Sequence, residues 1–193
     1  MEDIEVWNAY RKGDKASFER IYKDHIRILY KYGNRFTNDH GLVEDCIQEL
    51  FIDLWNKRNK IGDTDSIKRY LLGALRRRIV RKIQRDAKQK TNFTEGQYDF
   101  RLEANFEELL IKGEHIEETK LRINKAFEKL SKRQKEVIYL KFYQEQSYKE
   151  IEDTLGINYQ SVRNLLHNAL KAIKAALPHI SNLLILFSLN FFS

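Results

Sequence analysis

The feature that most restricts the fold of this chain is its shortage of residues that interrupt helices. One proline and eight glycines are spread over 193 residues, and the proline, Pro178, stands near the end of the chain. Alternating runs of β-branched residues, which would indicate strands, are also scarce. We therefore expect an all-α protein.

Three stretches with helical spacing follow one another in the first half of the chain. Apolar residues three and four positions apart predict a helix of about twenty residues between Phe18 and Phe36. The same spacing predicts a second helix over 40–59 and a third over about 67–90. Residues 61–66 form the loop between the last two, where Asp65 or Ser66 can cap the third helix.

The second half of the chain predicts a helix-turn-helix over 131–177. Ser131 with Gln134, and Ser147 with Glu150, form two capping boxes that fix helix starts. Gly156 suits a left-handed helix end, and a last helix follows Asn158, which caps it. A preceding helix begins near Ile116, with its core face formed by Leu121, Ile123, Ala126, Phe127 and Leu130. The helix-turn-helix is a motif that lays one helix into the major groove of DNA.

These elements divide the chain into two small helical domains. We predict an N-terminal domain over 1–90, an acidic linker over 91–115, a C-terminal helix-turn-helix domain over 116–178 and an apolar tail over 179–193. The linker is identified by its eight acidic and two basic residues between 91 and 119 and by its weak periodicity. Its aromatic and leucine residues predict partial order.

The last helix separates into an apolar and a polar face. Val162, Leu166 and Ile173 belong to the apolar face, which we expect in the core. The polar face is rich in Gln, Arg, Asn and His, the side chains that hydrogen-bond base edges in the major groove. An ordinary solvated face would carry more Glu and Lys. The predicted DNA-reading residues are Gln160, Ser161, Arg163, Asn164, His167, Asn168 and Lys171, with Lys141 of the preceding helix contacting phosphate.

The predicted helix over 67–90 is strongly basic. It contains ten Lys or Arg residues and one acid, Asp86, which is a local net charge of +9. The whole chain has a net charge of +7 and a pI near 9.3, which favours a polyanionic partner. Tyr70 could stack on an unpaired base. A solvated charged helix, an RNA contact and a membrane-surface contact remain alternatives.

The helix over 40–59 carries the opposite charge. Asp45, Gln48, Glu49 and Asp53 form a stripe opposite its apolar face. Such a stripe can bind a basic protein surface through charge pairing, or it can be an ordinary solvated face.

No constellation for catalysis or metal binding is visible. Cys46 is the single cysteine, on an apolar helical face, and the five histidines lack metal-ligand spacing. Glycine-rich phosphate loops, nucleophile elbows and CxxC motifs are missing. We expect a protein that is not an enzyme and needs no cofactor. The acidic N-terminus lacks a signal-peptide core, so we expect a cytoplasmic location.

Three motifs in this order resemble bacterial RNA polymerase sigma factors of the sigma-70 family, in the extracytoplasmic-function (ECF) subfamily. The run from Gly41 to Trp55, with Glu44-Asp45 and then Gln48-Glu49, is similar to the helix that binds core polymerase. Tyr70-Leu71 and the Arg-rich helix resemble the segment that melts and reads the −10 promoter element. Residues 130–177 resemble the domain that reads the −35 element.

The resemblance implies a role for each matching residue. Core polymerase would contact Glu44, Asp45, Gln48, Glu49 and Asp53. Residues 61–66 match the loop that binds a flipped −10 base. The −10 contacts would be Asp63, Thr64, Ser66, Arg69, Tyr70, Arg76, Arg77 and Arg81. The −35 contacts would be Lys141 and the polar face of the last helix, Arg163, Asn164, His167 and Asn168 above all.

Two features depart from the family pattern. Arg77 stands where many relatives have Asn after the Tyr-Leu turn, which should strengthen phosphate contact and loosen base choice. The tail beyond Pro178 concentrates apolar residues but is shorter than the roughly 20 residues of a membrane span. It could pack on its own domain, on a partner protein or on a membrane surface.

The expected function is that of an ECF-type sigma factor, which binds core RNA polymerase and directs transcription initiation at specific promoters. Its partners would be core polymerase, promoter DNA, and an anti-sigma factor or another recruiting protein, with a monomer as the free form. A stand-alone helix-turn-helix regulator is the alternative. Such regulators usually dimerise on palindromes, and this chain shows no clear dimerisation helix. An RNA-binding accessory protein would need the basic helix but not residues 131–177.

Overall fold

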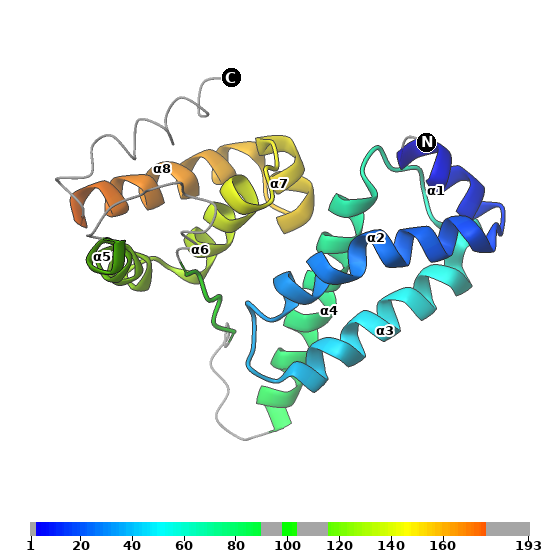
Figure 1. Ribbon diagram of the computed structural model, residues 1–193, viewed down its shortest axis with the longest axis horizontal. Helices are drawn as coiled ribbons and strands as arrows, with labels where there is room; N and C mark the ends of the chain where they lie inside the picture. The colour runs from blue at the N-terminus through cyan, green and yellow to red at the C-terminus, as the bar shows by residue number, and fades with distance from the viewer. Residues whose placement is uncertain (1–2, 90–97, 104–115, 177–193) are drawn as a thin grey trace. The chain divides into compact units, whose positions relative to one another are not determined.

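The computed structural model describes residues 3–89, 98–103 and 116–176, and these residues form helices and no strand, which confirms the all-α prediction (Figure 1). The chain groups into two compact units, 1–99 and 100–193, except that Asp153–Gly156 are grouped with the first. The helices of the N-terminal half are α1 (Asp3–Arg11), α2 (Lys15–Gly33), α3 (His40–Lys57), η1 (Arg58–Lys60) and α4 (Ile67–Gln89). Those of the C-terminal half are α5 (Ile116–Glu128), α6 (Lys132–Ile138), the π-helix η2 (Tyr139–Tyr143), α7 (Tyr148–Leu155) and α8 (Tyr159–Ala176).

The core of the N-terminal half lies between α2, α3 and α4, which pack against one another (Figure 1). Each helix contributes an apolar stripe at helical spacing. Gly33, the last residue of α2, lies where α2 meets α3, and a Cβ added there would come within 2.5 Å of Val43 Cγ1. The fully buried side chains of this core include Ile21, Leu29, Tyr32, Leu71, Leu75 and Ile79.

Local capping bonds begin three of these helices. Asp14 accepts a hydrogen bond from the Ser17 N–H at 2.8 Å, and Asp39 accepts one from Leu42 at 2.9 Å. Ser66 Oγ accepts the Arg69 N–H at 3.2 Å. Of the two candidate caps for α4, Ser66 therefore fills the role. Side-chain caps of this kind satisfy N–H groups that have no partner within the helix.

Helix α1 is an element that the sequence pattern did not predict. Its three buried residues are Val6, Trp7 and Tyr10. Trp7 and Tyr10 pack on each other with ring centroids 5.1 Å apart, and Tyr10 packs on Phe18 of α2 at 5.9 Å. The Tyr10 hydroxyl also donates to the carbonyl of Leu54. Tertiary contacts thus hold a helix that is too short to be stable alone in water.

In the C-terminal half, α5 and α6 both pack on α8. Both predicted capping boxes are present, with Ser131 and Gln134 bonded reciprocally at 2.8 and 3.3 Å and Ser147 and Glu150 at 2.8 and 3.2 Å. Gly156 has φ +64° and ends α7. Asn158 accepts the Ser161 N–H at 2.8 Å and caps α8. The predicted helix starts and the left-handed stop are confirmed.

One predicted core residue of α5 is wrong. Leu121 is 56% exposed, whereas Ile123, Ala126, Phe127 and Leu130 are buried. The four buried residues follow three/four spacing, while Leu121 is two positions from Ile123 and so falls on the opposite side of the helix.

The end of the expected apolar helix after Ser131 is a π-helix. The Gln144 N–H bonds to the Tyr139 carbonyl at 3.1 Å, five residues back, and the Gln146 N–H bonds to the Leu140 carbonyl at 3.0 Å. The Tyr139 and Tyr143 rings stack 5.5 Å apart, and Gln144 Nε2 donates to the Tyr139 hydroxyl at 3.0 Å. Glu145 then takes φ +57°, a conformation that non-glycine residues seldom adopt. These side-chain contacts stabilise the wider turn.

The described part of the predicted linker, residues 98–103, is ordered by its aromatic and leucine residues, as expected. Tyr98 packs on Phe36 of the first unit, with ring centroids 5.5 Å apart. Phe100 is fully buried, with its ring 5.7 Å from that of Tyr139 in the second unit, and Leu102 is also buried. The rest of the expected linker and the apolar tail over 179–193 lie outside the described residues. No helix within the described ranges is long and apolar enough to cross a membrane.

Candidate functional site

Helix α8 carries the two faces that its spacing predicted. Val162, Leu166, Ala169 and Ile173 are buried. On the polar face Ser161 is half-buried, and Gln160 donates to Asn164 at 2.9 Å. The remaining polar side chains are positioned by the helix rather than by a loop, which gives them a fixed spacing. The exposed residues of this face are Gln160, Arg163, Asn164, His167, Asn168 and Lys171.

Lys141 is positioned by aromatic residues of the helix-turn-helix. It belongs to the π-helix, and its Nζ lies 5.4 Å from the ring centroid of Tyr148 in α7. The Tyr148 ring packs on that of Tyr159, the first residue of α8, at 5.7 Å. Burial raises the pKa of Tyr148. The lysine charge is therefore held close to the N-terminal end of the polar helix.

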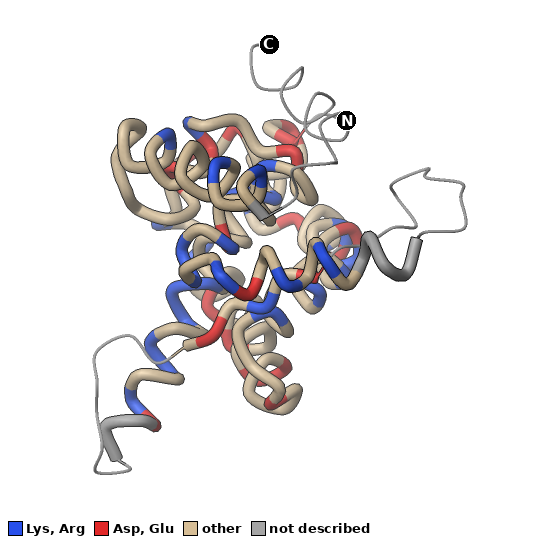
Figure 2. The backbone as a smooth tube through the Cα atoms, turned by 90° about the vertical axis from the view of Figure 1, so that its left-hand side faces the viewer, with Lys and Arg blue, Asp and Glu red and all other residues tan. Residues whose placement is uncertain are grey.

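Helix α4 presents an exposed arginine stripe. Arg77, Arg81 and Arg85 are exposed at intervals of four residues, which places them on one face of the helix. Figure 2 shows Lys and Arg recurring along α4. Tyr70 lies on the same side, nearer the start of the helix. It is half-buried, its ring is 5.0 Å from that of Trp7, and burial raises its pKa.

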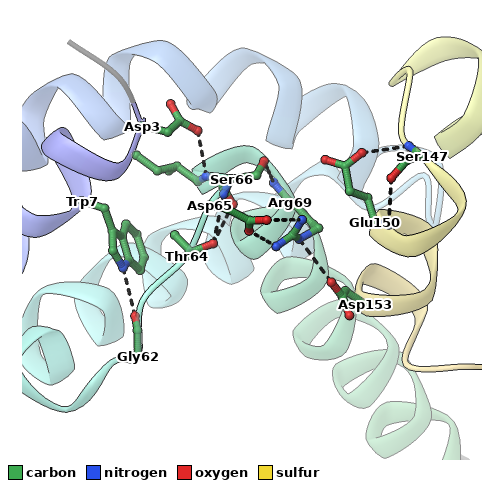
Figure 3. Close-up of polar contacts among 11 residues, drawn as sticks. Asp3, Trp7, Gly62, Thr64, Asp65, Ser66, Arg69, Ser147, Glu150 and Asp153 are labelled. Carbon is green, nitrogen blue, oxygen red and sulfur yellow. Dashed lines mark hydrogen bonds and ion pairs between the residues drawn. The ribbon is translucent and has the colours of Figure 1, made fainter.

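The loop over 61–66 leads directly into that face. Thr64 Oγ1 donates to the Ser66 carbonyl at 3.0 Å and accepts the Ser66 N–H at 3.3 Å. Asp65 forms an ion pair with Arg69, and Asp63 is exposed. Figure 3 shows Thr64, Asp65, Ser66 and Arg69 together at the start of α4. The loop thus presents short polar side chains beside an aromatic ring and a row of cations.

Arg76 does not share this surface. The residue is buried, and its guanidinium donates to the Tyr98 hydroxyl at 3.3 Å. It lies about 100° around the helix from Arg77, on the side that Tyr98 covers. We therefore remove Arg76 from the expected DNA contacts.

The acidic stripe of α3 is bound to the basic helix α4. Asp53 and Glu49 pair with Arg78, with Glu49 at 3.5 Å, and Asp45 accepts from Lys82 at 3.1 Å. Hydrogen bonds from Arg78 and then Lys57 lower the pKa of Asp53. The acids and bases that seemed to serve separate partners therefore already neutralise each other in part.

Two more residues lie on the polar face of α3. Glu44 accepts a hydrogen bond from Tyr30 and thereby raises the pKa of that phenol to about 12. Ile52 is 60% exposed. It falls four residues after Gln48 and three after Glu49, so it lies on the same face, and that spacing alone could have identified it.

Two family models match the chain in the same order as these surfaces. Sigma-70 region 2 matches residues 21–89, and sigma-70 region 4 matches residues 120–173. The chain belongs to the sigma-70 family of sigma factors. Region 2 covers α3, the loop over 61–66 and α4, while region 4 covers the helix-turn-helix.

Relatives extend the similarity over most of this sigma factor. It is 27% identical over 175 residues to the ECF RNA polymerase sigma factor SigL of Mycobacterium tuberculosis, covering 86% of this chain and 92% of SigL. It is 24% identical to SigK of Mycobacterium bovis, covering 85% and 87%. The ECF subfamily assignment from the sequence motifs is thereby confirmed.

Solved structures share the fold of this sigma factor. One is CnrH in complex with the cytosolic domain of CnrY, with a TM-score of 0.59 and 17% identity, covering 92% of this chain and 98% of that chain. Another is RpoE in complex with the anti-sigma factor NepR from Bartonella quintana, with a TM-score of 0.58 and 17% identity, covering 84% and 98%.

Within the described ranges, no three His, Cys, Asp or Glu side chains are grouped so that they could hold a metal ion. Cys46 is buried, and burial raises the pKa of its thiol. The described surfaces of α3, α4 and α8 present charged, hydrogen-bonding and aromatic groups.

Proposed function

We propose that this protein is an ECF-type sigma factor that binds core RNA polymerase and directs transcription initiation at specific promoters. The observation that carries the proposal is the presence of region 2 and region 4 in one chain, each with an exposed polar surface of matching chemistry. Such a subunit is a binding module rather than a catalyst. It would act in the cytoplasm, where the polymerase is.

In this proposal α3 binds the core enzyme. Its polar face meets a basic surface of the polymerase, and Ile52 adds an apolar contact at the centre of that face. Arg78 and Lys82 are half-buried, but their partners Asp45 and Glu49 are exposed to solvent. Ion pairs that are open to solvent on one side contribute little stability, so α3 can release them to the polymerase at small cost. The proposed contacts are Glu44, Asp45, Gln48, Glu49, Ile52 and Asp53.

The loop over 61–66 and the exposed face of α4 would bind the −10 element. The hydroxyls of Thr64 and Ser66 can hydrogen-bond an unpaired base, and the arginine stripe can contact phosphates. Arg77 carries a charged guanidinium where many relatives carry the side-chain amide of Asn. It would therefore increase affinity for the phosphates more than it would add selectivity for a base. The full set is Asp63, Thr64, Ser66, Arg69, Tyr70, Arg77 and Arg81.

Helix α8 would read the −35 element in the major groove. Its exposed Arg163 and Asn164 have the donor geometry for guanine and adenine edges. Lys141 would contact a phosphate and set the register of the domain on the duplex. The other proposed contacts are Gln160, Ser161, His167, Asn168 and Lys171.

A protein that restrains or recruits this sigma factor is a further proposed partner. CnrH and RpoE, which share its fold, are described with CnrY and with the anti-sigma factor NepR. We propose that an anti-sigma factor or another recruiting protein binds this chain in turn. We propose a monomer as the free form.

Reconstitution with core polymerase tests the function. The purified chain should co-elute with core enzyme and support transcripts with defined start sites from a promoter library, whereas core alone should not. A chain that binds duplex DNA specifically but neither co-elutes with core nor initiates transcription would instead be a stand-alone helix-turn-helix regulator.

A further inference from the structure

Helix α1 is attached to both ends of the loop over 61–66. Trp7 Nε1 donates to the Gly62 carbonyl at 3.0 Å, and Arg11 forms an ion pair with Asp63. At the other end, Asp3 accepts the backbone N–H of Ile67, the first residue of α4, at 2.9 Å. Figure 3 shows the Trp7 and Asp3 contacts on either side of the loop. Three residues of α1 therefore hold the entry, the body and the exit of the loop.

The bonds inside the loop are local and do not fix its position. Thr64 and Ser66 bond to each other, and Asp65 pairs with Arg69 four residues later. Such contacts define the shape of the turn but leave its orientation on the domain open. The contacts from α1 join residues that are more than fifty positions apart in the chain, so they are the kind that determines orientation.

Helix α1 is itself rigidly held. Trp7 is 1% and Tyr10 0% exposed. Trp7 packs on Tyr10 and on Tyr70, and the Tyr10 hydroxyl donates to the Leu54 carbonyl at the end of α3. One side of α1 is therefore embedded in the domain, while Asp3, Trp7 and Arg11, one helical turn apart, point their polar atoms to the loop.

We propose that α1 positions the loop over 61–66 and thereby sets how strictly it selects its base, with Asp3, Trp7 and Arg11 as the positioning residues. This inference rests on the proposed function of the loop in binding an unpaired −10 base. A binding site whose backbone is fixed before the ligand arrives loses less ordering entropy and rejects a misfitting base more strongly. Base discrimination in the −10 region therefore depends on a helix outside the loop and outside α4.

The test uses full-length protein reconstituted with core polymerase. The probe is a pool of duplex DNA with randomised −10 and −35 regions, and the transcripts are sequenced. Trp7→Phe leaves a smaller aromatic ring at the site and removes the N–H donor, and Arg11→Met removes the ion pair. The double variant should lose about three- to ten-fold of its base preference in the −10 region, as expected for the loss of one hydrogen bond and of one solvent-exposed ion pair that contributes little. Its preference in the −35 region and its affinity for core should stay unchanged.

Two controls separate positioning from general damage. Arg11→Lys keeps the positive charge and should retain the −10 preference. Glu5→Gln changes an exposed side chain of the same helix and should behave as the parent. Hydrogen exchange of the free protein gives a second readout, because peptides covering 61–66 should exchange faster in the double variant while α3 peptides should not.

The outcomes distinguish the inference from the function beneath it. If Thr64→Val alters the −10 preference but the folded α1 double variant does not, the loop binds the base and the positioning role is overturned. If neither variant alters that preference, or if the parent protein shows none, the loop does not bind the −10 base. The positioning role of α1 is then overturned as well, because it depends on that function. Unchanged exchange over 61–66 in the double variant would also overturn the positioning role.

Discussion

Gly33 is the residue whose size matters most directly for the packing of the N-terminal half. A Cβ at this position would lie 2.5 Å from Val43 Cγ1 and 3.3 Å from Ile79 Cδ1. Both neighbours are fully buried and have little room to move. We expect Gly33→Ala to lower the free energy of unfolding by about 1–3 kcal/mol, the usual effect of overpacking a core. Urea denaturation of the full-length protein measures it.

Gly41 provides the matched control. It is exposed in the first turn of α3, and the nearest atom to an added Cβ is Asp39 Oδ1 at 3.4 Å. Gly41→Ala should be neutral or stabilising by up to about 1 kcal/mol, because alanine loses less backbone entropy in a helix. Equal stabilities for the two variants would mean that α2 and α3 are not in close contact at Gly33.

Arg163 and Lys141 should differ in kind at the −35 element. Arg163→Ala should lose about 1–3 kcal/mol of binding free energy and relax preference at one base position, as expected for a bidentate base contact. Lys141→Ala should weaken all sequences alike and reduce the salt slope by about one, as expected for a phosphate contact. Holoenzyme binding to a panel of single-base −35 variants at several salt concentrations measures both. If Arg163→Ala weakens every sequence equally, Arg163 contacts phosphate instead.

At the scale of elements, α3 allows a direct test of core binding. Asp45→Lys with Glu49→Lys should abolish co-elution with core polymerase, because the reversed charges would face the basic surface proposed for the polymerase. The same change also places cations beside Arg78 and Lys82, so circular dichroism must show that the helices persist. Gln48→Ala, which alters no charge, should weaken core binding without that complication.

The control for this charge reversal is available on α2. Glu19→Lys with Asp24→Lys makes the same change in net charge, at two exposed acids that pair only within their own helix among the ion pairs found here. This variant should co-elute normally. Loss of core binding in both double variants would show that net charge, rather than the face of α3, governs the interaction.

Elements whose determinants are local could be predicted from the sequence. The capping boxes at Ser131 and Ser147 and the stop at Gly156 depend on residues within one turn, so their sequence pattern was sufficient. Helix α1 could not be predicted in this way, because its stability comes from tertiary contacts with Phe18 of α2 and with Leu54, forty-four positions after Tyr10. The ion pairs between α3 and α4 were missed for the same reason. The sequence of one helix does not show which of its residues will lie opposite which residues of its neighbour.

The residues of the candidate site also separate into those that local sequence predicts and those that depend on tertiary contacts. The polar face of α8 follows from spacing alone. The Arg76 guanidinium donates to Tyr98, twenty-two positions away, and no local pattern shows that contact. Spacing does separate Arg76 from Arg77, because the buried residues Leu72 and Ile79 lie four positions before Arg76 and three after it. The loop over 61–66 was identified by resemblance, but its attachment to α1 required the structure.

At the scale of the whole molecule, the limits of the second unit can be tested with fragments. Phe100 and Leu102 are buried, and the Tyr143 hydroxyl donates to the Glu103 carbonyl at 3.0 Å. A fragment over 98–177 should therefore be more stable than one over 116–177. The expected difference is about 3–5 kcal/mol, the range for emptying a buried phenylalanine site. Thermal and urea denaturation of both fragments measure it.

Phe100→Ala in the longer fragment isolates the side chain from the rest of the segment. It should account for most of the difference between the two fragments, since the ring lies against Tyr139. If the two fragments prove equally stable, residues 98–115 contribute nothing to the stability of the second unit. The start of the C-terminal domain predicted from the sequence, residue 116, would then also be the start of the folded unit.

The π-helix affects how the sequence of this protein can be aligned with related sequences of different length. Each residue of an α-helix advances the side-chain direction by about 100°, and a π-turn accommodates one extra residue per turn. Deleting a single residue between 139 and 143 would restore regular α-geometry and keep the flanking turns in phase, but it would change the direction of Lys141, which lies inside the wide turn. A deletion of one residue here would therefore alter the proposed phosphate contact without breaking the helix. For the same reason, a sequence alignment with its gap on the wrong side of position 141 would assign that contact to the wrong residue.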